Sequence, residues 1–128
     1  MLTAMRLAAI ALIVLALSGC GRRVISKHWE DGSYRVYARP VSEEIIMGHY
    51  IGDGAILGLS EPTVVSAGSD ARYVVFRRQP ASGGIEHYYI EKKPDTAGDV
   101  SGPFTHDAYK AIATRLALPE FSWHLKQP

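Results

Sequence analysis

The alternation of apolar and polar residues predicts several short β-strands in the middle of the chain. These segments are rich in Val, Ile, Tyr and Phe, which favour strands. The predicted strands are residues 33–38, 44–51, 63–66, 71–79 and 85–93. Clusters of Gly, Pro, Asp and Ser separate them, and the connections are too short to hold crossover helices. We therefore expect an antiparallel sheet.

The pattern changes to a helical period after residue 104. Four apolar residues follow the spacing i, i+3, i+4, i+7: Tyr109, Ile112, Ala113 and Leu116. Thr105 is a suitable N-cap, and Leu118 precedes a proline, which disfavours continuation of a helix. One helix is predicted over residues 105–117. Residues 121–125 are apolar and either fold back as a final strand or offer a partner an aromatic segment.

Together these elements predict an α+β domain, with a meandering antiparallel sheet of about five strands and one C-terminal helix packed on it. The loop Pro80–Gly83 sets the expected register of the strongest hairpin. This register places Arg77 opposite Glu86, Arg72 opposite Glu91 and Val75 opposite Tyr88.

The N-terminal segment is an uncharged apolar run over residues 7–17, preceded by Arg6. A membrane span needs about 20 apolar residues, so this shorter run is typical of a secretory signal peptide. The run leads into Leu17-Ser18-Gly19-Cys20, which resembles the lipobox of bacterial lipoproteins. The resemblance implies cleavage before Cys20, a diacylglycerol on its sulfur and an acylated new N-terminus.

This resemblance divides the chain into a removed signal peptide (1–19), a lipidated tether (20–32) and one globular domain (33–128). In Gram-negative lipoproteins an Asp after the cysteine favours retention in the inner membrane. Gly21 stands there instead. The resemblance therefore favours the periplasmic side of the outer membrane.

A second resemblance covers the C-terminal half of the chain. The strand His87-Tyr88-Tyr89-Ile90, the turn Gly102-Pro103-Phe104 and the helix after Thr105 resemble the ending of an uncharacterised family of small bacterial lipoproteins. That resemblance implies no function.

Charge and composition exclude several function classes. Removal of Arg6 with the leader leaves thirteen residues of each sign, and a neutral domain has no broad field to attract nucleic acid. The single cysteine excludes an intramolecular disulfide. The glycine-rich segment 52–58 has Leu57 where a dinucleotide loop requires glycine, so it is interpreted as a turn that leads into a strand.

No catalytic, metal or cofactor site is predicted. Cys20 is occupied by lipid, and no nucleophile elbow is present in the sequence. The five histidines lack the spacing of metal ligands. His49 and His87 both lie beside a tyrosine in predicted strands, where they either meet across the sheet or are two separate, half-buried imidazoles.

Tyrosine and arginine alternate along the predicted strands, and both are enriched at protein interfaces. The candidate partner-binding residues are Tyr34, Tyr37, Arg77, Arg78 and Tyr88. The alternative is that these tyrosines are ordinary half-buried residues of the sheet.

These features favour a small envelope lipoprotein that acts at the membrane surface as a non-enzymatic binding or structural module. Its partners would be the membrane, through Cys20, and an envelope protein or the cell wall. An inhibitor or immunity-type lipoprotein and an enzyme with an unrecognised site are the alternatives.

We predict that the mature chain begins at Cys20 and carries acyl chains, because the sulfur is the nucleophile that receives the lipid. Intact-mass spectrometry of protein extracted from membranes measures this directly. Cys20→Ser should abolish the lipid mass. A mass that matches an unmodified chain starting at Met1 would contradict the prediction.

Overall fold

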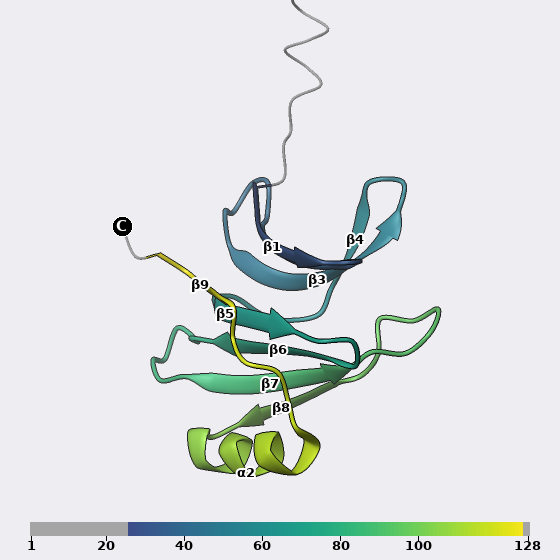
Figure 1. Cartoon of the computed structure of the whole chain (residues 1–128). Helices are drawn as coiled ribbons and strands as arrows, with labels where there is room; N and C mark the ends of the chain where they lie inside the picture. The colour runs from purple at the N-terminus through teal and green to yellow at the C-terminus, as the bar shows by residue number, and fades with distance from the viewer. Residues whose placement is uncertain (1–25, 127–128) are drawn as a thin grey trace, which may run out of the picture.

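The computed structural model describes residues 26–126 and divides their strands between two antiparallel sheets. Figure 1 shows the four-stranded sheet A at one end of the molecule, the five-stranded sheet B in the middle and the helix at the other end. The predicted α+β class, with antiparallel strands and one C-terminal helix packed on a sheet, is confirmed. The strands are more numerous than the sequence pattern indicated.

Sheet A is a simple meander in the order β1-β2-β3-β4. Its strands are β1 (Ser26–Asp31), β2 (Tyr34–Ala38), β3 (Ile45–Gly52) and β4 (Ala55–Gly58). The turn between β3 and β4 contains Asp53, with a φ of 53°, between two glycines that also have positive φ. Asp and Gly adopt this left-handed conformation more readily than other residues. The glycine-rich segment is therefore a turn that leads into a strand, as predicted.

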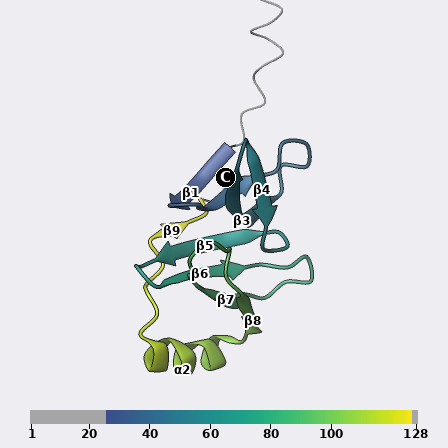
Figure 2. The same cartoon turned by 90° about the vertical axis from the view of Figure 1, so that its right-hand side faces the viewer.

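Sheet B has the order β8-β7-β6-β5-β9. Its strands are β5 (Val64–Ser69), β6 (Tyr73–Arg78), β7 (Glu86–Glu91), β8 (Val100–Phe104) and β9 (Trp123–His124). The last strand pairs with β5, so the chain folds back after the helix. The interpretation of residues 121–125 as a returning strand is confirmed. Figure 2 shows this segment running from the helix along sheet B to β5.

The helix α2 (His106–Leu116) begins and ends close to the predicted residues. The Thr105 side chain accepts a hydrogen bond from the backbone N–H of Ala108, as an N-cap does. Asp107 in the first turn and Arg115 in the last complement the helix dipole. Tyr109 is the buried residue of the helix and packs against His87 of sheet B.

The main apolar core lies where the two sheets meet. The buried cluster takes Tyr34, Val36 and Met47 from sheet A, and Val64, Ala67, Val74, Phe76 and Ile90 from sheet B. Side chains of adjacent strand residues point to opposite faces. Phe76 and Ile90 therefore face this core, whereas Arg77 and His87 lie on the other face of sheet B, beside α2.

Three segments differ from the sequence prediction. Residues 26–31 were assigned to the tether, yet Ser26–Asp31 pairs with β2 as an edge strand. The sequence of this strand is mostly polar and lacks the apolar alternation that predicts a strand, since an edge strand has little apolar surface to bury. The short edge strand β4 was expected only as the strand that follows the glycine-rich turn, and it was not counted among the five predicted strands. The predicted turn Gly102-Pro103-Phe104 is instead the end of β8 (Val100–Phe104), an edge strand in which proline is tolerated.

The predicted register of the β6–β7 hairpin is wrong by one residue. Arg77 lies opposite His87, and Val75 lies opposite Tyr89. The loop is longer than predicted, and its Gly83 and Gly84 both have positive φ. The shift places Arg78 opposite Glu86, and these two side chains form an ion pair.

Gly68 allows the segment after α2 to cross sheet B closely. A Cβ atom built at Gly68 would lie 2.0 Å from the carbonyl oxygen of Glu120. Because this neighbour is backbone, the contact cannot be relieved by a rotamer change. Gly68 is therefore required for the path of the chain from α2 to β9.

We predict that Gly68→Ala lowers the free energy of unfolding by roughly 1–3 kcal/mol, the usual cost of overpacking. Gly58→Ala is the matched control, because its Cβ would meet the Ile46 Cδ1 at an ordinary 3.5 Å. Urea unfolding of the purified proteins measures both. Equal stability of the two variants would show that the crossing segment is not held against β5.

Candidate binding cleft between the two sheets

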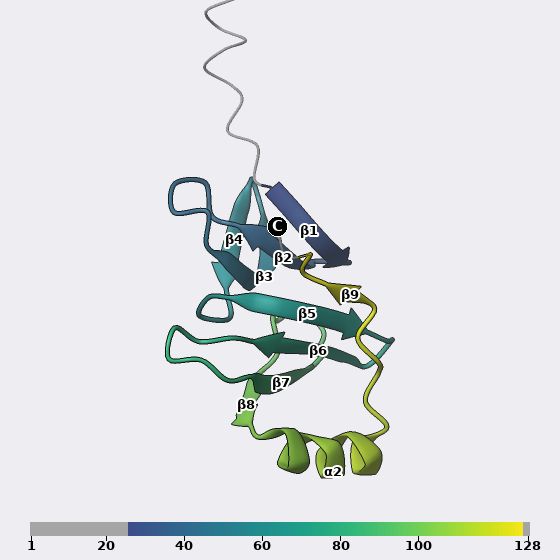
Figure 3. The same ribbon diagram turned by 90° about the vertical axis from the view of Figure 1, so that its left-hand side faces the viewer.

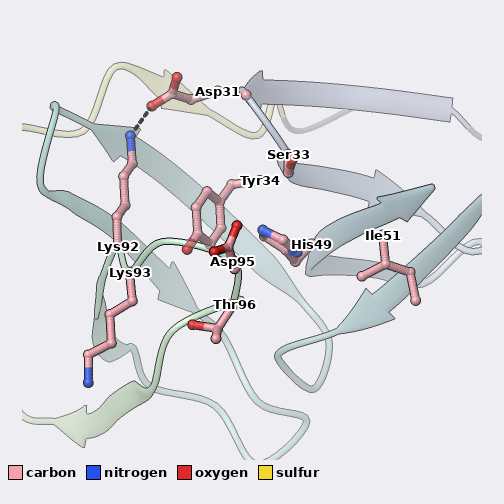
Figure 4. Close-up of a pocket in the computed structure, with 10 residues that line it drawn as sticks. Asp31, Ser33, Tyr34, His49, Ile51, Lys92, Lys93, Asp95 and Thr96 are labelled. Atoms are coloured by element: carbon pink, nitrogen blue, oxygen red, sulfur yellow. Dashed lines mark hydrogen bonds and ion pairs between the residues drawn. The ribbon is translucent and has the colours of Figure 1, made fainter.

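An open cleft of about 500 Å³ lies at the junction of the two sheets. Three segments far apart in the sequence form it: the β1–β2 turn, the end of β3 and the loop after β7. Figure 4 shows their side chains around the cleft. The lining residues are Asp31, Gly32, Ser33, Tyr34, His49, Ile51, Lys92, Lys93, Asp95 and Thr96.

Lys92 fixes one wall of the cleft by joining the two sheets. Its Nζ lies 2.7 Å from the Asp31 Oδ2 and donates a second hydrogen bond, of 2.6 Å, to the backbone carbonyl of Asp70. Hydrogen bonds from Lys92 and Ser69 lower the pKa of the Asp31 carboxyl. Asp31 therefore remains ionised at neutral pH, and the pair holds the β1–β2 turn against sheet B.

Tyr34 and His49 form an aromatic floor. The rings are 4.8 Å apart and meet edge to face. The Tyr34 hydroxyl donates a 2.8 Å hydrogen bond to the Ala97 carbonyl, which fastens the loop after β7, and burial raises the pKa of this tyrosine. The His49 Nδ1 is buried and has no hydrogen-bond partner among residues 26–126.

The rim of the cleft combines three kinds of chemistry. Ile51 is 62% exposed and gives it an apolar side. Lys93 and Asp95 carry opposite charges, and Thr96 adds a hydroxyl. This combination suits a ligand that has both apolar and polar groups, and the volume lies within the usual range for ligand sites.

A second polar cluster crosses the other face of sheet B. The strand register places His124, Ser66, Arg77 and His87 side by side on four adjacent strands. The Ser66 Oγ accepts a 2.8 Å hydrogen bond from the Arg77 guanidinium and lies 2.9 Å from the His124 Nδ1. A serine beside an imidazole resembles a nucleophile with its base.

Ser66, Arg77 and His87 of this second cluster are covered, whereas His124 is exposed. Ser66 is only 1% exposed, and the Arg77 guanidinium lies beneath the Phe121 ring, 4.6 Å from its centroid. His87 stacks on Tyr109 at 4.6 Å. Burial and the charges of Arg77 and His106 lower the pKa of His87, and burial raises that of Tyr109 to about 12. A substrate could not reach Ser66 without displacing the segment after α2, so we assign this cluster to packing.

The predicted partner-binding residues do not form one contact face. Tyr34 and Tyr37 are buried. Arg77 lies beneath Phe121, whereas Arg78 donates to Glu86 and to the Pro62 carbonyl. The ring of Tyr88 stacks on Phe76. The structure therefore distributes these five residues over the core and both sheets rather than over one exposed patch.

The two histidines singled out from the sequence lie in separate clusters: His49 contacts Tyr34, and His87 contacts Tyr109. Within residues 26–126, no group of three or more His, Cys, Asp or Glu side chains could hold a metal ion. The same part of the chain contains no helix long and apolar enough to cross a membrane. The signal peptide and Cys20 lie outside the described residues.

No protein-family model, curated protein or solved structure matches this chain. The sequence predicted no cleft: it indicated Tyr34 as a partner-binding candidate and His49 as a histidine beside a tyrosine, and it gave no sign of Asp31, Lys92, Asp95 and Thr96. No motif indicated these four residues, because only the packing of the two sheets brings them together.

We predict that Lys92→Met destabilises the fold by about 1 kcal/mol at pH 7, the scale of a partly exposed charged hydrogen bond. Because the pKa of Asp31 is lowered, the contribution of its ion pair with Lys92 to stability is complete above pH 3.8, the ordinary pKa of the carboxyl. This contribution is lost as the pH falls through the pKa of Asp31 in the folded state. The difference between wild type and variant should therefore shrink from pH 5 to pH 2.

Lys93→Met is the control, since Lys93 and its partner Asp99 are both exposed. Urea unfolding across this pH range measures all three proteins. A loss of stability that is independent of pH, or equal in both variants, would contradict the role assigned to Lys92.

Proposed function

We propose that this chain is a lipid-anchored envelope protein that binds a protein or cell-wall partner in the cleft between its sheets, without transforming it. Cys20 supplies the anchor, and Gly21 favours the periplasmic side of the outer membrane. The observation that carries the proposal is the cleft itself, which combines an aromatic floor of Tyr34 and His49 with a rim of mixed charge.

The chemistry of the cleft supports binding. An apolar wall with a few convergent polar groups is the usual composition of a ligand site. Tyr34 is held by its hydrogen bond to Ala97 and the β1–β2 turn by Lys92, so the floor and one wall are formed before a ligand arrives. Preformed walls reduce the ordering cost of binding. The Ser66 hydroxyl on the other face of sheet B is buried, which favours a binding module over an enzyme.

Site-specific photo-crosslinking in intact cells tests the proposal. A photoreactive residue at Thr96, on the rim of the cleft, should give a discrete crosslinked product, whereas one at the exposed Arg115 of α2 should not. Adding Ile51→Arg to the Thr96 protein should remove the product by blocking the cleft. Digestion of the wall before electrophoresis separates a wall partner from a protein partner.

Equal products from Thr96 and Arg115, or a Thr96 product that survives Ile51→Arg, would contradict the proposed cleft. Surface biotinylation and mass spectrometry of the same cells report separately on export and lipidation.

A further inference from the structure

We propose that the β2–β3 turn inserts Val41 into the surface of the bilayer that holds the lipid on Cys20. The inference rests on the lipid anchor of the proposed function. It adds a second membrane contact and an orientation, with sheet A against the membrane and α2 away from it.

The strand register places this turn beside the start of the described chain. Ser26 lies opposite Ala38, and Val41 follows Ala38 by three residues. Figures 1–3 show the turn and the start of β1 at the same end of the molecule, with α2 at the far end. A lipid attached before Ser26 would therefore pull on the end of the molecule that carries Val41.

The length of chain between the anchor and the domain limits how far sheet A can lie from the membrane. Six residue steps separate Cys20 from Ser26, and even a fully extended chain covers at most about 22 Å over that distance. A domain held this closely must present some surface to the lipid head groups. The neighbouring β2–β3 turn is within reach of that interface.

Val41 has the properties of an inserting residue. It is 91% exposed, the highest value among the large apolar residues described. The turn around it is held by two backbone hydrogen bonds, from the Arg39 N–H to the Glu44 carbonyl at 2.9 Å and from the Glu43 N–H to the Arg39 carbonyl at 3.0 Å. The side chain is therefore presented on a fixed loop, and its transfer from water to lipid is favourable.

The charges around Val41 indicate an apolar rather than an ionic contact. Arg39 carries one positive charge, and Glu43 and Glu44 carry two negative charges. Such a turn gains nothing from anionic head groups. We therefore expect the same insertion in uncharged membranes.

Spin labelling tests the inference on the lipidated mature protein in phosphatidylcholine vesicles. Because lipid occupies the sulfur of Cys20, a cysteine introduced at position 41 would be the free thiol available for labelling. A nitroxide there should collide several-fold more with oxygen than with a water-soluble nickel complex. The control is Ile85→Cys, at an exposed apolar position in the β6–β7 loop, whose label should behave as in water.

A second label tests whether Val41 itself causes the contact. A nitroxide at the neighbouring Ser42 should also collide more with oxygen than with the nickel complex. Val41→Asp should remove that preference, and because Val41 is so exposed the substitution should not unfold the domain. Labels at 41 and 85 with equal accessibility would overturn the inference. A label at 41 that is open to water in vesicles but immobilised in native membranes would overturn it in favour of a protein partner.

Flotation of the vesicles distinguishes the two proposals. Protein that floats with vesicles while its label at position 41 faces water retains the lipid anchor and loses only the insertion of Val41. Protein that carries no lipid and does not float would overturn the anchor and, with it, the insertion.

Discussion

The apolar contact between the two sheets is the interaction on which the rest of the structure depends. Val36 and Met47 of sheet A are fully buried in one cluster with Val74, Phe76 and Ile90 of sheet B. Small antiparallel sheets are only marginally stable alone, and they gain stability when an apolar face is covered. The cleft lies at the edge of this contact, so its three segments are adjacent only while the sheets are packed together.

Sheet B is covered on its second face as well, and this layer contains polar groups. Arg77 and His87 lie under Phe121 and Tyr109, and the hydrogen bond from Arg77 to Ser66 satisfies part of the cluster. A buried imidazole favours its neutral form, in agreement with the lowered pKa of His87. The close crossing at Gly68 brings the segment after α2 over this layer. The polar layer therefore contributes to holding α2 and β9 in place.

Much of the architecture could be predicted from local sequence, where the signals are strong. The helix was located by its apolar period and by Thr105, and the strands around Val36, Met47 and Val75 by their composition. The edge strands β1 and β8 were missed, since edge strands bury little and tolerate polar residues and proline.

The candidate site was harder to predict for a different reason. Loop length sets the register of a hairpin, and the longer β6–β7 loop with Gly83 and Gly84 gave Glu86 to Arg78 rather than to Arg77 as its cross-strand partner. The contact between Lys92 and Asp31 spans 61 residues of sequence, and no local pattern encodes such a distance. Tyrosines that suggested an interface, such as Tyr34, are instead used largely in the core.

Native-state amide hydrogen exchange tests most directly whether the two sheets form one cooperative unit. If the sheets depend on each other, the slowest amides of β3 and β6 should exchange with the same free energy, equal to that of global unfolding. Mutual dependence of the sheets would be contradicted if the slowest amides of β3 exchange with a free energy of opening about 2 kcal/mol or more below that of the slowest amides of β6. Sheet A would then unfold separately, and the cleft would not be a preformed site.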